Sequence, residues 1–322
     1  MAHEADWLSP KPKGRSAVPV LGTMNFGKRT PESEAARIMH AALERGVDWF
    51  DTANAYNGGE SERIIGRFLK ANRKRVRVAT KCGIGNMNGP AEGLAPEAIR
   101  AALDASLARL QLEQIDLYYL HTPDRSTPIL ETVRVLEEAR VAGKIAHWGV
   151  SNFASWRIAR IDAVCAAHTW PKPRVSQVLY NLLVRQLDVE YFDYARDEGI
   201  HTTVYNPLAG GLLAGKGLET VKPGSRFDRN ARYQARYLSP RMREHAKACL
   251  ALANEAGMDP VRLAYAWVAQ QRGVDSVLLG PATVEQLEQG IAGCMHSLEP
   301  QLASKIEALH RDFIGTDASY AR

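Results

Sequence analysis

The chain has 322 residues, of which 45% are hydrophobic and 24% charged, as is typical of a folded globular protein. Its net charge of +5 is spread along the sequence, and the densest basic run, at 73–77, is too short for a nucleic-acid-binding surface. No apolar run approaches the roughly 18 residues of a membrane span, the start of the chain lacks a signal-peptide layout, and the cysteines form no C-x-x-C pair. We therefore expect a cytoplasmic protein that binds neither nucleic acid nor a membrane.

From residue 18 onward, short apolar runs alternate with amphipathic stretches. The apolar runs predict strands, and the amphipathic stretches between them predict helices. The expected strands lie at 18–22, 47–50, 76–80, 115–120, 145–150, 175–179, 200–204 and 276–279. The expected helices lie near 32–45, 61–72, 96–110, 128–141, 154–167, 189–198, 240–256, 260–271 and 283–292.

Eight strand–helix alternations favour an α/β fold of the closed (β/α)8 type, the TIM barrel. A doubly wound open sheet is the alternative, and it is disfavoured because no G-x-G-x-x-G motif follows the first strand. We predict a single domain over residues 1–322, with its core at about 18–292 and an extension at 293–322 that contains a helix and a tail. The segment 205–239 is too long for a plain connection and is predicted to be a functional loop after strand 7.

Polar side chains follow successive strands of the predicted barrel. Asp51 ends the second strand, with Tyr56 on the loop behind it. Lys81 ends the third strand, and His121 follows the fourth. Because catalytic groups of such barrels lie at the carboxyl ends of the strands, we expect these side chains to meet at one site.

This set of side chains suits proton transfer. A lysine ammonium beside the phenol of Tyr56 is expected to lower the tyrosine pKa toward neutral pH, with Asp51 holding the ammonium in place. His121 is expected to donate a hydrogen bond to a carbonyl oxygen. The sequence carries no metal-binding motif such as H-E-x-x-H, so we expect an external hydride donor and no metal.

The chain resembles the aldo-keto reductases. The motif D-x-A-x-x-Y at 51–56, with Lys81 and His121, is similar to the catalytic tetrad of that family in identity and order. The stretches at 21–27, 149–153 and 177–181 also resemble family motifs, and the likeness covers about residues 18–292. Within the family, the stretch at 205–213 and the end of the chain at 320–322 look most like the aflatoxin-aldehyde and succinic-semialdehyde reductases.

The resemblance implies NADPH-dependent reduction of aldehydes, and in second place of ketones, with Tyr56 as general acid and hydride from nicotinamide C4. NADH is the alternative cofactor, because this chain lacks the basic residues that many family members use near the adenosine 2′-phosphate. The residues implied to bind the cofactor are Ser151, Asn152, Gln177, Tyr205, Asn206, Leu208, Gly210, Leu212, Gly280, Thr283, Gln286 and Gln289.

The resemblance also implies a substrate pocket, and the basic residues in it suggest a carboxylated substrate. The residues expected to line it are Met24, Trp148, Arg226, Phe227, Arg236 and Arg322. The expected partner is a small carbonyl compound, and the likeness favours a homodimer. A different class of function stays open: some proteins of this fold are nicotinamide-binding regulatory subunits with little turnover.

Overall fold

The computed structural model describes residues 6–85, 91–316 and 318, and it forms a closed parallel barrel of eight strands. The strands are β1 (Val18–Gly22), β2 (Trp49–Asp51), β3 (Arg77–Cys82), β4 (Ile115–Leu120), β5 (Ile145–Ser151), β6 (Val175–Leu179), β7 (His201–Tyr205) and β8 (Ser276–Leu279). Strand β1 pairs in parallel with both β2 and β8, which closes the ring. The (β/α)8 prediction is confirmed, and the doubly wound alternative is wrong.

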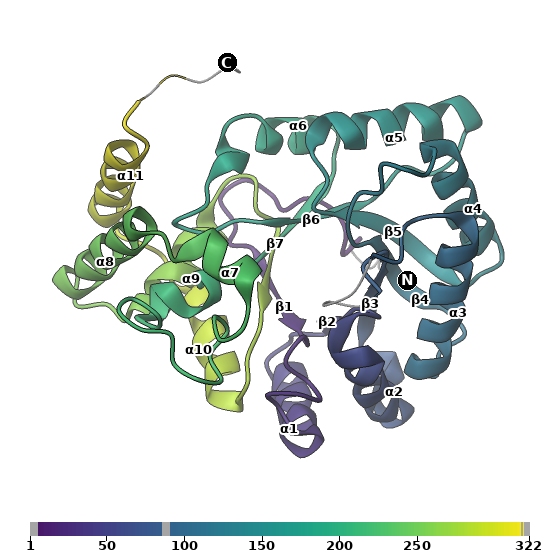
Figure 1. The fold of residues 1–322 in the computed structure, drawn as a ribbon, viewed down its shortest axis with the longest axis horizontal. Helices are drawn as coiled ribbons and strands as arrows, with labels where there is room; N and C mark the ends of the chain where they lie inside the picture. The colour runs from purple at the N-terminus through teal and green to yellow at the C-terminus, as the bar shows by residue number, and fades with distance from the viewer. Residues whose placement is uncertain (1–5, 86–90, 317, 319–322) are drawn as a thin grey trace.

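The helices form a layer around the strands (Figure 1). They are α1 (Glu32–Glu44), α2 (Glu60–Asn72), α3 (Pro96–Leu110), α4 (Ile129–Val141), α5 (Ser155–His168), α6 (Tyr191–Asp197), α7 (Ala231–Tyr237), α8 (Pro240–Glu255), α9 (Pro260–Gln270), α10 (Val284–Met295) and α11 (Pro300–Ile314). Short 3₁₀ turns occur at η1 (Tyr56–Gly59), η2 (Arg73–Arg75), η3 (Gln186–Asp188) and η4 (Ala209–Ala214). Across the described ranges, no helix is long and apolar enough to cross a membrane.

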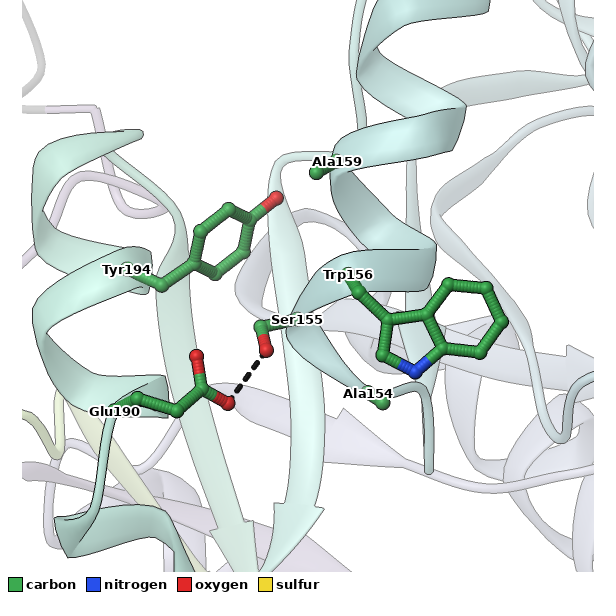
Figure 2. A pocket seen from close by; sticks show the side chains of 6 residues that line it. All are labelled: Ala154, Ser155, Trp156, Ala159, Glu190 and Tyr194. Carbon is green, nitrogen blue, oxygen red and sulfur yellow. Dashed lines mark hydrogen bonds between the residues drawn. The ribbon is translucent and has the colours of Figure 1, made fainter. Parts of the chain in front are cut away.

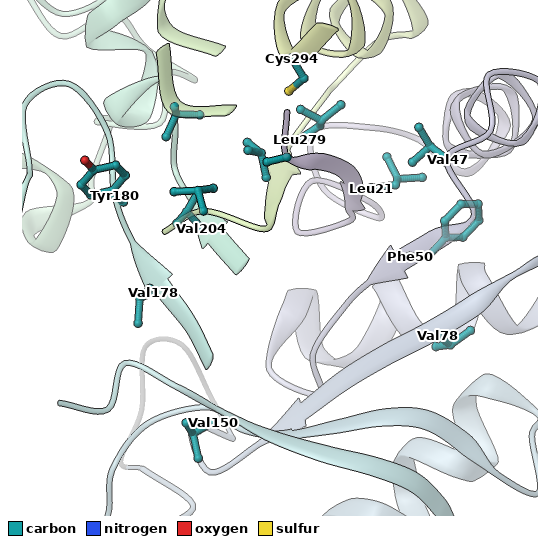
Figure 3. Packing of buried hydrophobic residues seen from close by; sticks show 14 of the residues in the cluster. Leu21, Val47, Phe50, Val78, Val150, Val178, Tyr180, Val204, Leu279 and Cys294 are labelled. Carbon is teal, nitrogen blue, oxygen red and sulfur yellow. The ribbon is translucent and has the colours of Figure 1, made fainter. Parts of the chain in front are cut away.

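Alternation along each strand sends one set of side chains into the barrel and the other toward the helices. The inner set packs as one apolar cluster with Val20, Trp49, Leu117, Tyr119 and Val175 among its members. The outer set belongs to the larger core between strands and helices. Figure 3 shows part of this outer layer, with side chains from strands around the ring. Each strand therefore has a fixed inner face, and its last inward residue points into the mouth.

The chain before β1 covers the base of the barrel. Leu8 has no exposed surface and belongs to the inner apolar cluster. The ring of Trp7 stands edge-on to that of Trp49, with 4.7 Å between the ring centroids. Asp6 forms an ion pair with Arg174 at the same end. These contacts leave the opposite end, at the carboxyl ends of the strands, as the functional mouth.

The long segment after β7 is folded, and it contains a helix that the sequence pattern did not predict. Helix α7 carries Tyr237, whose side chain is fully buried. The hydroxyl of Tyr237 accepts hydrogen bonds from the side-chain amides of Asn206 at 2.6 Å and Asn181 at 3.2 Å. Gly210 has a φ of +72°, and a Cβ there would lie 2.9 Å from the ring of Tyr233. The segment is therefore tied to β6 and β7 and packs closely on itself.

Candidate active site

The mouth of the barrel collects polar side chains from successive strands. Asp51 and Lys81 lie on the inner faces of β2 and β3, two residues beyond Trp49 and Ala79, which belong to the inner cluster. His121 follows β4 with the same relation to Tyr119. The period of two along a strand therefore explains why these particular residues face one another.

Asp51 and Lys81 form a fully buried ion pair at the floor of the site. The exposed fractions of the Lys81 and Asp51 side chains are 0% and 2%. Lys81 Nζ donates to Asp51 Oδ1 and, at 2.7 Å, to the carbonyl oxygen of Thr52. Gln177 Nε2 donates to Asp51 Oδ2 at 2.8 Å. Burial raises the pKa of Asp51 and lowers that of Lys81, while their mutual attraction opposes both shifts.

Tyr56 lies beside this pair and is half-buried. The Nζ atom of Lys81 is 5.1 Å from the centroid of the tyrosine ring. Burial raises the pKa of Tyr56 above its usual value, and the Asp51 carboxylate raises it further. The net shift of this pKa is therefore upward in the cofactor-free protein, whereas the sequence predicted a net lowering by Lys81. The phenol stays protonated at neutral pH, as a proton donor requires.

His121 faces Tyr56 across the mouth. The two ring centroids are 5.9 Å apart, with 78° between the ring planes. Burial lowers the pKa of His121 well below its ordinary value, and the Lys81 ammonium lowers it further. Its Nδ1 is buried and has no hydrogen-bond partner among the described residues. A neutral imidazole next to the proton donor can orient a polar substrate atom without competing as an acid.

We expect the ring of His121 to show no titration between about pH 6 and pH 8, because its charged form is disfavoured by burial and by the neighbouring ammonium. The histidine ring signals in NMR spectra of the protein, recorded across that pH range, would test this. His121→Asn identifies the signal by removing it. A midpoint near the ordinary value of about 6.5 would contradict the assignment.

The opposite wall of the mouth carries amides and hydroxyls from β5, β6 and β7. Asn152 has a left-handed φ of +64°, and its Nδ2 donates to the His121 carbonyl oxygen at 2.9 Å. Its Oδ1 accepts a bond from Tyr205 at 2.7 Å. The amide of Asn152 is thus committed within the protein. Ser151 and Gln177 keep a hydroxyl and an amide oxygen, a donor and an acceptor of the kind that a nicotinamide carboxamide needs.

The other residues predicted to bind cofactor lie on two further stretches of the rim. Asn206 and Leu208 lead into η4, where Gly210 is in a left-handed conformation and Leu212 is buried. Around α10, Thr283 caps the helix by accepting from Gln286 N. A Cβ at Gly280 would meet no other atom within 4 Å, and Gln286 and Gln289 are exposed. The binding of the cofactor by these residues stays a prediction.

Of the residues predicted to line the substrate pocket, Met24 and Arg226 lie together. A guanidinium nitrogen of Arg226 donates to Asn25 Oδ1 at 2.9 Å, and the group lies 5.8 Å from the Tyr233 ring centroid. Its charge also reaches Tyr56, whose pKa it lowers against the effect of burial. Arg236 is exposed beside the same Tyr233 ring. Arg322 lies outside the described residues.

Trp148 and Phe227 do not line an open pocket. Trp148 is 2% exposed and lies in the outer core, since it is one residue out of phase with the inward-facing Gly149. Its indole nitrogen donates to the Pro171 carbonyl oxygen at 3.2 Å. Phe227 is fully buried, and a Cβ on Gly217 would lie 2.9 Å from its ring. Both predictions fail because the strand phase and the folding of the loop decide where these rings point.

Sequence reasoning missed the tyrosines of α7 and the role of Ser61. Tyr233 and Tyr237 are four residues apart, and this spacing places both on one face of a helix. Helix α2 begins at Glu60, with Gly59 as its N-cap residue, so Ser61 lies in the first turn and does not cap the helix. The hydroxyl of Ser61 instead bonds to Thr23 and Thr52 inside the protein. The i,i+4 tyrosine spacing was available in the sequence, whereas the serine contacts were not.

A separate groove of about 420 Å³ lies on the outside of the barrel between α5 and α6. Figure 2 shows Ser155 donating to Glu190, with Tyr194 above this pair and the Trp156 ring turned away from it. The residues that line this groove come from the helical layer, and none of the polar side chains at the mouth is among them. The groove is therefore distinct from the tetrad site.

Comparison with known proteins identifies the family. The Aldo/keto reductase family model matches residues 20–311. The chain is 37% identical over 326 residues to aflatoxin B1 aldehyde reductase member 2 of Mus musculus, covering 92% of this chain and 87% of the mouse protein. It is also 37% identical over 294 residues to the uncharacterized oxidoreductase YrpG of Bacillus subtilis (strain 168), covering 88% of each. The chain therefore belongs to the aldo/keto reductase family and is an NAD(P)H-dependent oxidoreductase that acts on carbonyl groups.

Proposed function

We propose that this protein reduces aldehydes to alcohols with NADPH, using Tyr56 as the general acid. The observation that carries the proposal is the meeting of Tyr56, His121 and the buried Asp51–Lys81 pair at one end of the barrel. These groups match a reaction in which a carbonyl oxygen gains a proton. Ketones are a second substrate class for the same chemistry.

The side chains divide the work of protonation. A bound nicotinamide supplies the hydride that the carbonyl carbon gains. The neutral ring of His121 holds the carbonyl oxygen near Tyr56, which transfers its phenolic proton to that oxygen. Lys81 stabilises the negative charge that develops on the phenol, and Asp51 keeps the ammonium in place. The tyrosinate regains a proton from solvent after the alcohol leaves.

NADPH is the proposed cofactor because of the likeness to the family. The start of α10, where the adenosine 2′-phosphate of NADPH would bind, is the part of the site that we expect to decide between NADPH and NADH. Helix N-termini attract phosphate groups. Here the amide of Val284 donates to Glu34 Oε1 at 3.2 Å, and the amide of Ala282 donates to Gln286 Oε1 at 2.8 Å. A phosphate at this position would displace these two carboxylate and amide oxygens. NADH therefore belongs in every assay as the parallel cofactor.

The basic side chains near the mouth support a substrate that carries a carboxylate. Arg226 and Arg236 both lie beside Tyr233. A planar guanidinium suits a carboxylate because it offers paired donors. Arg322, at the end of the chain, is proposed as the further contact. The relatives named as aflatoxin B1 aldehyde reductases support an aldehyde as the reacting group.

Turnover with two aldehydes tests the function. We expect NADPH to be consumed with both succinic semialdehyde and 4-nitrobenzaldehyde, followed by the absorbance of the reduced nicotinamide. Arg322→Ala should raise KM for the acidic substrate by about 10- to 100-fold, as expected for the loss of a charged hydrogen bond. The neutral substrate, for which KM should stay unchanged, is the internal control. Equal effects on both substrates would contradict a carboxylate contact.

A nicotinamide-binding regulatory role is the second candidate. It would be favoured by tight NADPH binding with no turnover across a broad panel of carbonyl compounds. The intact set of Tyr56, Lys81 and His121 supports catalysis over that role. A homodimer and a cytoplasmic location are part of the proposal, and sedimentation analysis of the purified protein tests the first of these.

A further inference from the structure

A closed chain of buried hydroxyls lies under the Asp51–Lys81 pair. Ser61 Oγ is 2.9 Å from Thr52 Oγ1 and 2.8 Å from Thr23 Oγ1. Thr23 Oγ1 donates to the carbonyl oxygen of Asp51 at 2.9 Å. The three hydroxyl-bearing side chains are fully buried. Ser61 Oγ can also donate to the carbonyl oxygen of Thr23, at 3.0 Å. Each hydroxyl has a single proton, so Ser61 shares its donor between the hydroxyl and the carbonyl of Thr23 and accepts from Thr52.

This chain of hydroxyls connects two neighbouring residues at the end of β2: it runs from the hydroxyl of Thr52 to the carbonyl oxygen of Asp51. Thr52 is also fixed by its amide, which donates to the Ala79 carbonyl oxygen at 2.8 Å. The carbonyl oxygen of Thr52 accepts a hydrogen bond from Lys81 Nζ at 2.7 Å. Ser61 therefore anchors the residue that orients the lysine ammonium, although it touches neither Tyr56 nor the mouth.

The next residue of α2 fixes the strand that carries Lys81. Glu62 is fully buried and accepts from Thr80 Oγ1 at 2.6 Å and from Arg109 Nε at 2.6 Å. Thr80 directly precedes Lys81 in β3. The carboxylate of Glu62 also acts on Lys81 through space and raises its pKa against the effect of burial. The first turn of α2 thus holds β2 through Ser61 and β3 through Glu62.

We propose that Ser61 is a positioning residue that sets the place of the Lys81 ammonium through the carbonyl of Thr52. The inference rests on the proposed reductase function, in which that ammonium stabilises the negative charge left on Tyr56 when its proton is transferred. Without the serine hydroxyl, Thr52 keeps the bond of its amide to Ala79 but loses its side-chain hydrogen bond, and the ammonium that its carbonyl orients shifts away from the phenol. A small displacement of the Lys81 ammonium from Tyr56 slows proton transfer more than it weakens cofactor binding.

Ser61→Ala is the test variant. We expect kcat for aldehyde reduction to fall by about 10- to 100-fold, with the NADPH dissociation constant within about twofold of wild type, a limit well below a tenfold change. The solvent isotope effect on kcat should rise, because proton transfer becomes slower. Thr132→Val is the matched control: Thr132 is buried and donates to the Leu94 carbonyl oxygen at 3.0 Å, a bond that does not involve Asp51, Tyr56, Lys81 or His121. Both variants should lower Tm, but only Ser61→Ala should lower kcat.

A second readout needs no turnover. The ammonium protons of Lys81 should exchange faster with solvent in Ser61→Ala than in wild type or Thr132→Val, as followed by NMR of the cofactor-free protein. An unchanged exchange rate together with a normal kcat would overturn the inference. So would a loss of the same factor when Ser61→Ala is added to Lys81→Met, since a residue that acts through Lys81 has no further effect once the lysine is gone. An inactive wild type with faster exchange in Ser61→Ala would reject the proposed function and keep the inference.

Discussion

Tyr56→Phe is expected to lower kcat/KM for aldehyde reduction by about 10²- to 10⁴-fold, the usual contribution of a general acid. Burial and the Asp51 carboxylate raise the pKa of the phenol, so wild type carries the transferable proton at neutral pH. The phenylalanine ring keeps the contact with His121 and the place beside Lys81. The loss should therefore fall on the chemical step and leave NADPH binding near its wild-type strength.

Steady-state NADPH consumption and fluorescence titration with NADPH measure these two quantities. Tyr118→Phe is the matched control, because Tyr118 is a fully buried tyrosine of β4 that lies in the outer core and not at the mouth. That variant should keep the wild-type rate. Substantial activity in Tyr56→Phe would contradict the assignment of the tyrosine as the proton donor.

Lys81→Met is expected to destabilise the protein by about 3–5 kcal/mol, the typical cost of breaking a buried ion pair. The change leaves the Asp51 carboxylate fully buried, with Gln177 as its remaining side-chain donor among the described residues. Burial already raises the pKa of Asp51, and Lys81 opposes this shift. Removing the lysine raises the pKa of Asp51 further, so the folded state of the variant favours the protonated carboxyl.

The pH dependence of unfolding checks this explanation. A carboxyl whose folded pKa is above the unfolded value of about 3.9 favours folding fully below that value, and the advantage is lost as pH rises through the folded pKa. The deficit of Lys81→Met relative to wild type should thus shrink as pH falls from neutral, as measured by urea denaturation. The double variant Asp51→Asn/Lys81→Met should recover stability and lose this pH dependence. A deficit that is independent of pH would contradict the account.

The barrel and the tetrad could be predicted because both follow from local patterns. Apolar runs mark buried parallel strands, and the residue after each run falls at the mouth. Asp51, Lys81 and His121 were found by reading off these positions. The phase within each strand then decides which neighbour faces inward, and Trp148 was misplaced because that phase was not applied to it.

Other parts of the site depend on contacts between distant segments. The contacts of Ser61 with Thr23 and Thr52 span 38 and 9 residues, and a serine at a helix start is equally typical of a cap. Phe227 is buried because the loop around it folds onto η4, which no short-range pattern encodes. The raised pKa of Tyr56 follows from burial, which the sequence does not contain.

Because the base of the barrel is covered, solvent reaches the site from the mouth. Leu8 and the edge-to-face pair of Trp7 and Trp49 lie between the floor of the site and bulk water at that end. Lys81 has no exposed surface, so its protons equilibrate with solvent by way of the mouth. A ligand bound in the mouth blocks this route. Exchange of the Lys81 ammonium protons with solvent should therefore slow while the ligand is bound. Residues that cover the base of the barrel thus help to set the rate at which the Lys81 ammonium exchanges protons with water.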